Sequence, residues 1–282
     1  MSNCDKCSSE GSCNNKEGCN KIFQRCGNIK KVIGIMSGKG GVGKSTLTGI
    51  TAVLLQNKGY KVGVLDADIT GPSMPRFFGI NNLRAVIGQM EDSESVKFEP
   101  VVTKSGIKVM SMNLLTEDEE SPVIWRGPII TGVLNQMYQD TVWGDLDYLL
   151  IDMPPGTGDV PLTIMQSFPI DYMLMVATPQ AMVTMIVKKA AIMAEKLGVN
   201  ILGVVENMAY IKCGSCGNKQ NIFSSKPADY YAKELGLPLL YEFPIDTQLT
   251  ERIEEGMGES YISHNSYFKD FIELIIDKLN KV

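Results

Sequence analysis

The chain has 282 residues and a formal net charge of −5. This acidic balance argues against a general nucleic-acid binder, whose surface is expected to be basic. No apolar run approaches the ~18 residues that a membrane-spanning helix needs, and the polar N-terminus has no signal-peptide core. We therefore expect a cytoplasmic protein with reduced cysteines and with neither a membrane nor a nucleic acid as its partner.

The first 28 residues differ in composition from the rest of the chain. They are rich in cysteine, serine, asparagine and glycine and contain almost no apolar residue before Ile22. Such a segment cannot bury a core, so we expect a flexible, cysteine-rich tail over residues 1–28. Its cysteines are Cys4, Cys7, Cys13, Cys19 and Cys26. An iron–sulfur cluster, a zinc knuckle and a thiol-rich segment without metal are all compatible with their spacing.

Residues 29–282 alternate between apolar runs and amphipathic segments, which predicts one α/β domain. Strands are expected at residues 32–36, 61–66, 107–112, 147–152, 171–177, 200–206 and 239–243. Helices are expected at residues 44–58, 128–139, 160–167, 180–197, 226–235, 247–255 and 265–280. Near-continuous apolar runs such as residues 148–151 indicate burial on both faces, hence a mostly parallel central sheet with helices on both faces. Residues 82–122 are less regular, and the acidic residues in this segment are expected to lie in solvated loops. They are Asp92, Glu94, Glu117, Asp118, Glu119 and Glu120.

A phosphate-binding loop follows the first predicted strand. It satisfies the pattern G-x-x-x-x-G-K-[ST] and is followed by a helix-length segment, which is the context that this motif requires. Its residues are Gly38, Lys39, Gly40, Gly41, Val42, Gly43, Lys44, Ser45 and Thr46. Lys44 is expected to reach the outer phosphates of a nucleotide, and the Ser45 hydroxyl to bind Mg²⁺. The sequence therefore predicts that the protein binds a nucleotide.

The second lysine of this loop indicates which class of phosphate-binding-loop proteins the chain resembles. An ordinary loop of this kind needs only Lys44, whereas here Lys39 also follows the first glycine. The loop thus resembles the deviant loop of the MinD/ParA/nitrogenase-iron-protein class. That resemblance implies that Lys39 reaches across a homodimer to the phosphates of the partner subunit, and it assigns catalytic roles to Lys39 and Lys44.

Two predicted strands end in carboxylates. Residues 62–65 lead into Asp66 and Asp68, and residues 148–151 lead into Asp152. Ligands of open parallel sheets bind at the carboxyl ends of the strands, and a buried carboxylate needs a partner such as Mg²⁺ with its waters. We interpret Asp152 as the Walker B aspartate and expect the loop at Gly156 to respond to the γ-phosphate. The class resemblance implies that Asp68 is catalytic and orients the attacking water.

Longer motifs specify a branch of the class. They are Asp66-x-Asp68-x-x-Gly71-Pro72-Ser73, Trp125-Arg126-Gly127-Pro128 and Asp152-x-Pro154-Pro155-Gly156-Thr157-Gly158-Asp159. Over residues 30 to about 260 the chain resembles the Mrp/ApbC family of iron–sulfur carrier ATPases. This resemblance implies that Asn207 contacts adenine and that Pro244 and Asp246 flank the base.

A C-x-x-C turn lies late in the chain, at Cys213 and Cys216. Two thiolates at this spacing provide half of a four-thiolate shell, and a two-fold homodimer would supply the other half. A [4Fe–4S] cluster that bridges two subunits is favoured over zinc, and zinc over a redox dithiol, because redox pairs usually open a helix after a strand.

The Mrp/ApbC resemblance implies a slow, switch-type ATP hydrolase that delivers its cluster to apo iron–sulfur proteins. The alternative is a positioning or partition switch of the MinD/ParA kind. MinD-type proteins dock on lipid through a basic amphipathic terminal helix, whereas the charges of the last predicted helix balance. We therefore expect that helix to pack against the body of the protein.

Overall fold

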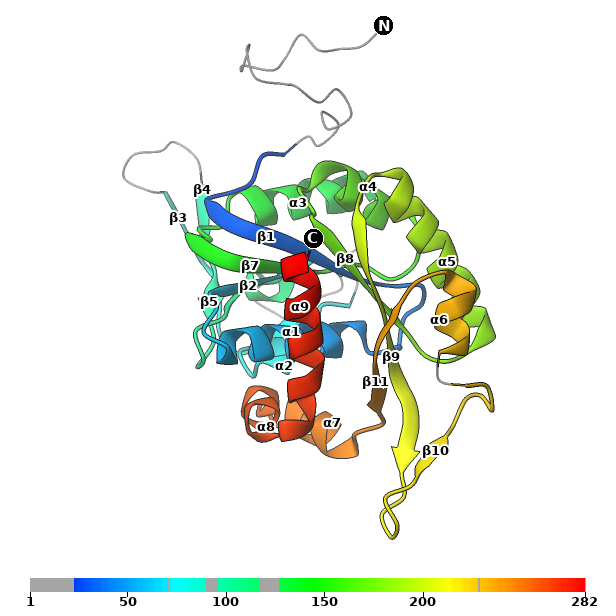
Figure 1. Cartoon of the computed structure of the whole chain (residues 1–282). Coiled ribbons are helices and arrows are strands. Elements are labelled where there is room, and N and C mark those ends of the chain that lie inside the picture. Colours follow the sequence, from blue (N-terminus) through cyan, green and yellow to red (C-terminus); the bar gives the residue numbers. More distant parts are fainter. Residues whose placement is uncertain (1–22, 70, 90–95, 117–126, 228, 282) are drawn as a thin grey trace, which may run out of the picture.

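A nine-stranded sheet forms the centre of the computed structural model, which describes residues 23–69, 71–89, 96–116, 127–227 and 229–281 (Figure 1). Its strands are β1 (Asn28–Ser37), β2 (Val62–Asp66), β5 (Val101–Val102), β6 (Lys108–Met110), β7 (Asp145–Asp152), β8 (Tyr172–Ala177), β9 (Asn200–Lys212), β10 (Lys219–Asn221) and β11 (Leu239–Pro244). The strand order is β10-β9-β8-β1-β7-β2-β6-β5, and β11 also pairs with β9. All pairs in this sheet are parallel except β9 with β10 and β5 with β6.

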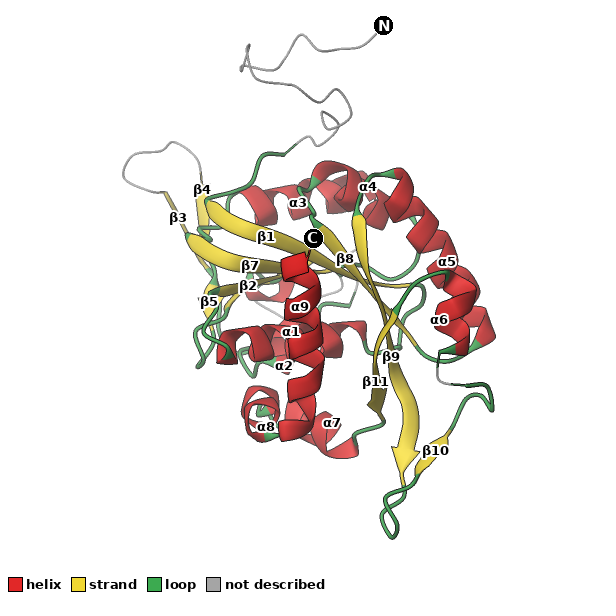
Figure 2. Cartoon of the chain, in the orientation of Figure 1, coloured by secondary structure: helices red, strands yellow, loops and turns green. Residues whose placement is uncertain are grey.

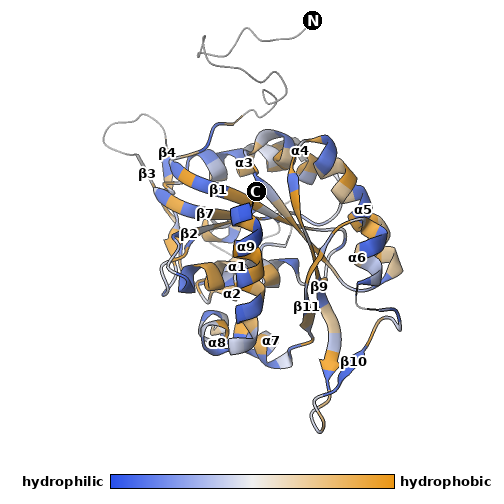
Figure 3. Ribbon diagram, in the orientation of Figure 1, coloured by the Kyte–Doolittle hydropathy of each residue, from blue (hydrophilic) through white to orange (hydrophobic). Residues whose placement is uncertain are grey.

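Helices cover both faces of the sheet (Figure 2). They are α1 (Lys44–Asn57), α2 (Met74–Phe77), α3 (Gly127–Gln139), α4 (Asp159–Ser167), α5 (Ala181–Lys196), α6 (Tyr230–Leu235), α7 (Thr247–Glu254), α8 (Gly258–His264) and α9 (Lys269–Lys281), with 3₁₀ turns η1 (Met112–Leu114) and η2 (Ser266–Phe268). The central strands are apolar on both faces (Figure 3), and every residue of β2 and β8 is buried. The predicted fold class, a mostly parallel sheet covered by helices on both faces, is thereby confirmed.

Three differences from the predicted strands and helices come from contacts between residues that are distant in sequence. Strand β9 continues six residues beyond its predicted end at residue 206, because its last residues pair with β10. Within residues 82–122, predicted to be less regular, β3 (Val86–Gln89) pairs antiparallel with β4 (Val96–Glu99). The six acidic residues expected in loops there lie outside the described residues. The helix expected at 265–280 begins at Lys269 instead, and α8 precedes it.

The terminal helix α9 packs against the body, as its balanced charges predicted. Its apolar face consists of the buried residues Phe271, Ile272, Ile275 and Leu279. The ring of Phe271 lies 5.1 Å from that of Phe243 in β11. This face is therefore covered by the sheet rather than offered to lipid.

The folded body begins slightly before the boundary predicted at residue 29. Residues 1–22 of the expected tail lie outside the described residues. Phe23 donates a backbone hydrogen bond to Ser167 O (3.1 Å), and its ring meets Phe168 edge-on at 6.0 Å. Cys26 is half-buried against the core, and β1 already begins at Asn28. Aromatic packing against α4 thus draws the last tail residues into the domain.

A contact between two glycine backbones holds α2 against the turn after α7. Gly79 and Gly256 both have positive φ, at 64° and 69°. A Cβ on Gly79 would lie 2.6 Å from Gly256 O and 2.9 Å from its Cα. A side chain at residue 79 would therefore clash with backbone atoms, which cannot change rotamer to make room.

We expect Gly79→Ala to lower the free energy of unfolding by about 2–4 kcal/mol, from the left-handed backbone and the overpacking together. Gly59→Ala is the matched control, because Gly59 also has positive φ (87°) but open space around its Cβ position. This control should lose only about 1–2 kcal/mol. Urea unfolding measures both variants, and equal losses would contradict a steric role for the Gly79–Gly256 contact.

Candidate functional site

The predicted phosphate-binding loop connects β1 to α1 at the carboxyl edge of the sheet. Gly41 and Gly43 have φ of 78° and 82°, a left-handed backbone that glycine adopts without steric cost. The first turn of α1 has no side-chain cap, so its N–H groups are available to an anion. A Cβ on Gly40 or Gly41 would meet nothing within 4 Å, which leaves space along the loop. The loop is therefore shaped for a polyphosphate.

Lys44 and Asp152 form a buried ion pair at the start of α1. Lys44 Nζ lies 2.8 Å from Asp152 Oδ2, and the two side chains are 6% and 0% exposed. Ser45 Oγ donates to the same oxygen at 2.6 Å, and Thr48 Oγ1 donates to Asp152 Oδ1 at 2.8 Å. Asp68 lies on the other side of Lys44, at 3.8 Å from its Nζ. The structure thus brings Lys44, Ser45, Asp68 and Asp152 together as predicted, and adds Thr48.

This set of donors fits a nucleotide with Mg²⁺. A serine hydroxyl and an aspartate carboxylate in contact at the helix start are oxygen ligands of the kind that Mg²⁺ takes beside phosphates. The lysine next to them carries the positive charge that a β- or γ-phosphate requires. Mg²⁺ bound there would supply charge neutralisation for the phosphates.

Asp66 has a structural position that the sequence did not indicate. Its Oδ2 accepts hydrogen bonds from the backbone N–H groups of Ser73 (3.0 Å) and Met74 (3.1 Å) and from Ser111 Oγ (3.1 Å). Desolvation first, and then the charge of Asp152, raise the pKa of Asp66 to about 7. This carboxyl group therefore holds the start of α2 and the loop that carries Asp68, while its predicted nucleotide contact stays a prediction.

Lys39 and Gly156 lie on either side of Ser37, at the rim of the site. The Lys39 side chain is exposed, and its backbone oxygen accepts a hydrogen bond from Ser37 Oγ at 3.0 Å. Gly156, with φ of 87°, donates its N–H to Ser37 O at 2.8 Å. Lys39 and Gly156 are thus both hydrogen-bonded to Ser37, the last residue of β1. Trp125 and Arg126 lie outside the described residues, and Gly127 opens α3.

A pocket of about 160 Å³ adjoins the loop on the side of β9 and β11. Asn207 Nδ2 donates to Val42 O at 3.0 Å and would lie 2.1 Å from a Cβ on Gly43, so that only glycine fits there. The lining residues are Gly41, Gly43, Thr46, Leu47, Ile50, Asn207, Met208, Phe243, Pro244, Ile245, Asp246, Leu249, Thr250 and Tyr267. The predicted base contacts Asn207, Pro244 and Asp246 therefore share one pocket with the phosphate loop.

Asp246 is held by three donors that pattern reasoning did not find. Its Oδ1 accepts from Leu249 N (3.0 Å) as the N-cap of α7. Its Oδ2 accepts from the hydroxyls of Tyr261 (3.0 Å) and Tyr267 (2.6 Å). Burial and this carboxylate raise the pKa of Tyr267. Asp246 thus fixes the wall of the pocket, and a tyrosine 21 residues away gives no local signal of this.

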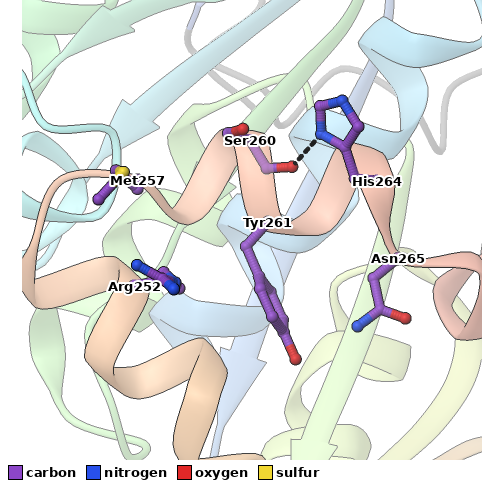
Figure 4. A pocket seen from close by; sticks show the side chains of 6 residues that line it. All are labelled: Arg252, Met257, Ser260, Tyr261, His264 and Asn265. Carbon is purple, nitrogen blue, oxygen red and sulfur yellow. Dashed lines mark hydrogen bonds between the residues drawn. The ribbon is translucent and has the colours of Figure 1, made fainter.

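A second hollow, of about 350 Å³, lies among residues of α7, α8 and the turns next to them (Figure 4). It is lined by Arg252, Met257, Ser260, Tyr261, His264 and Asn265. His264 is exposed, and its Nδ1 lies 2.7 Å from Ser260 O. This hollow contains none of the predicted site residues.

Cys213 and Cys216 lie in the turn between β9 and β10, on an arm that projects from the body (Figure 1). Cys213 is half-buried and Cys216 is exposed. Hydrogen bonds from the backbone of Cys216 and Ser215 lower the pKa of the Cys213 thiol. Among the residues that the structure describes, no group of three or more His, Cys, Asp or Glu could hold a metal ion. The two thiols therefore offer an accessible but incomplete metal shell.

The fold and this site define a P-loop nucleotide-binding protein with a cysteine-bearing arm. The family model of the NUBPL iron-transfer P-loop NTPase, of the ParA group, matches residues 28–280. The iron-sulfur cluster carrier protein of Clostridium perfringens is 59% identical over 275 residues, 96% of each chain. This chain belongs to the NUBPL iron-transfer P-loop NTPase family, which confirms the resemblance inferred from its motifs.

Solved structures agree with this assignment. The nucleotide-binding protein from Archaeoglobus fulgidus, in complex with ADP, is 40% identical with a TM-score of 0.73, over 86% of this chain and 92% of that one. The septum site-determining protein MinD of Pyrococcus horikoshii, complexed with Mg-ADP, has a TM-score of 0.60 at 22% identity, over 89% and 97% of the two chains. The second likeness concerns the fold alone. Within the described ranges, no helix is long and apolar enough to cross a membrane.

Glu206 is a buried acid at the edge of the nucleotide pocket. It is 2% exposed and pairs in register with Glu242 of β11. Desolvation, followed by the charges of Glu242 and Asp229, raises the pKa of Glu206 to about 7. The folded protein therefore holds this proton more tightly than the unfolded chain does. Its contribution to stability is fully present below the unfolded pKa of 4.5 and is lost as the pH rises through about 7.

The Glu206→Gln variant should remove this pH dependence, because an amide of the same shape does not ionise. Between about pH 5 and about pH 8, we expect the free energy of unfolding of the wild type to fall by about 1–3 kcal/mol more than that of the variant. Urea unfolding at the two pH values measures the difference. Parallel pH profiles would show that Glu206 is ionised in the folded protein.

Proposed function

We propose that this protein is an ATP-dependent iron–sulfur cluster carrier. It binds ATP with Mg²⁺ at the loop of residues 38–46, holds a [4Fe–4S] cluster between two copies of the chain, and transfers the cluster to apo iron–sulfur proteins. The observation that carries this proposal is the exposed arm with two thiols, joined directly to a nucleotide pocket. A positioning switch of the MinD/ParA kind would leave Cys213 and Cys216 without a role.

In the nucleotide site, the proposed chemistry is mainly electrostatic. Lys44 neutralises charge on the outer phosphates, and Ser45 and Asp152 hold Mg²⁺. Asp68, 3.8 Å from Lys44 Nζ, orients the attacking water. Lys39 is exposed at the rim, where it can reach the phosphates of the partner subunit. Hydrolysis of ATP that requires Lys39 of a second subunit is slow, which suits a protein that uses the nucleotide as a switch.

At the arm, two thiolates from each of two subunits complete a four-thiolate shell. The lowered pKa of Cys213 favours the thiolate, which is the form that binds iron. Because the arm projects from the body, a cluster held there remains accessible to an acceptor protein. Zinc in the same shell is the competing occupant, and the iron measurement below separates the two.

The two lysines should differ in their effects. Lys44→Ala removes the charge opposite the phosphates and should weaken ATP binding by about 10–100-fold. Lys39→Ala is the matched control from the same loop, and it should leave binding within about twofold while suppressing hydrolysis, because its charge acts on the partner's nucleotide. Calorimetric titration and phosphate release measure the two properties. Equal loss of binding in both variants would remove the separate role of Lys39.

The cargo site is tested by anaerobic reconstitution with iron and sulfide. In a full-length chain with Cys4, Cys7, Cys13 and Cys19 replaced by serine, we expect about four iron atoms per dimer. Adding Cys216→Ala leaves two thiolates per dimer and should abolish iron binding and transfer, while ATP binding survives. Adding Cys26→Ala instead is the control, since this thiol packs against the core. Retention of iron in the Cys216→Ala protein, or zinc alone in the parent, would overturn the proposal.

A further inference from the structure

Met208 has an unusual backbone conformation. Its φ is 53°, and it is the one non-glycine residue with positive φ among the residues that the structure describes. For a side chain without a polar group near the backbone, this left-handed conformation is unfavourable. It persists only where the surroundings hold it, and such residues concentrate at functional sites.

Met208 lies in β9 between the residues that pair with β8 and those that pair with β10. Up to Glu206, β9 is paired with β8 in the central sheet. From Tyr210 to Lys212 it is paired antiparallel with β10, which carries it to Cys213 (Figure 1). Opposite β11, the register of β9 shifts between Glu206 and Tyr210. The left-handed residue thus occupies an irregularity of the strand, here called the corner, between the part of β9 that builds the nucleotide pocket and the part that carries the thiols.

On the body side, the corner is tied to the phosphate-binding loop. Met208 and Asn207 both line the nucleotide pocket. The Asn207 amide donates to Val42 O at 3.0 Å. A nucleotide that enters the pocket therefore meets the corner itself.

On the arm side, the strand rests on the wall of the same pocket. Tyr210 O accepts a hydrogen bond from Ile245 N at 2.8 Å. Lys212 Nζ lies 5.9 Å above the ring of Tyr267, which also lines the pocket. The root of the arm is therefore in direct contact with the pocket wall.

We propose that Met208 is a positioning residue whose left-handed backbone sets the direction of the arm, so that nucleotide in the pocket changes the exposure of Cys213 and Cys216. This inference rests on the proposed nucleotide site and adds the connection between that site and the thiols. The corner transmits the change because an L-residue has fewer accessible backbone conformations than glycine. Glycine at the same place can adopt many and would let the arm move independently.

The test measures thiol alkylation in the full-length apo-protein, with and without Mg-ATP. Iodoacetamide labelling is followed at Cys213 and Cys216 by peptide mass spectrometry, which separates these thiols from the other cysteines. In the wild type and in Met208→Ala, nucleotide should change the rate by about threefold or more, the size that a coupling of this kind gives. In Met208→Gly the two rates should agree, measured at a Mg-ATP concentration that saturates this variant in its own binding titration.

Three results would overturn the proposal: an unchanged nucleotide effect in Met208→Gly, its loss in Met208→Ala, or its absence in the wild type. In the last case, ATP titration and iron reconstitution on the same preparation show whether the proposed function stands without the coupling. Should the glycine variant unfold, Met208→Asn replaces the comparison, since asparagine tolerates the left-handed region best among non-glycine residues. The asparagine variant should keep the nucleotide effect, and loss of it would also overturn the proposal.

Discussion

The buried ion pair between Lys44 and Asp152 joins the phosphate-binding loop to the centre of the sheet. Neither side chain can be buried alone without a large desolvation cost, so each requires the other in the absence of a ligand. The pair forms because β1 and β7 are adjacent and parallel, which brings the end of β7 beside the start of α1. Ser45 and Thr48 donate hydrogen bonds to the carboxylate of this pair, and Asp68 lies 3.8 Å from its ammonium group.

Around the Lys44–Asp152 pair, at the carboxyl ends of β2 and β7, acidic side chains outnumber basic ones. Asp66 and Asp152 are paired in register at the ends of neighbouring strands, and both are completely buried. Lys44 is the cation that contacts Asp152, while Asp66 is compensated by backbone N–H groups of the α2 start. Burial first, and then the charge of Asp152, raise the pKa of Asp66. A site of this kind favours a bound cation, which agrees with the proposed Mg²⁺ site.

The two proposed activities lie on one strand. Strand β9 runs past the nucleotide pocket and ends at Lys212, next to Cys213. Asp246 and its two tyrosines brace the pocket wall against which the arm rests. The distance between the nucleotide and the thiols is therefore bridged by hydrogen-bonded strand rather than by a flexible linker. This arrangement provides the structural connection between the nucleotide pocket and the proposed cluster site.

Local patterns in the sequence determined the phosphate-binding loop, the alternation of strands and helices, and the carboxylates at strand ends. These features depend on residue spacing within about ten positions, so pattern and propensity suffice to predict them. The register of strands and the contacts between distant segments were decided by tertiary structure. In the tertiary structure, Asp66 accepts hydrogen bonds from the start of α2, and Thr48 donates to Asp152. Asp246 accepts from the hydroxyl groups of Tyr261 and Tyr267. Met208 has a left-handed backbone. Each of these depends on which parallel strands become neighbours, and that choice is made by packing of the whole core.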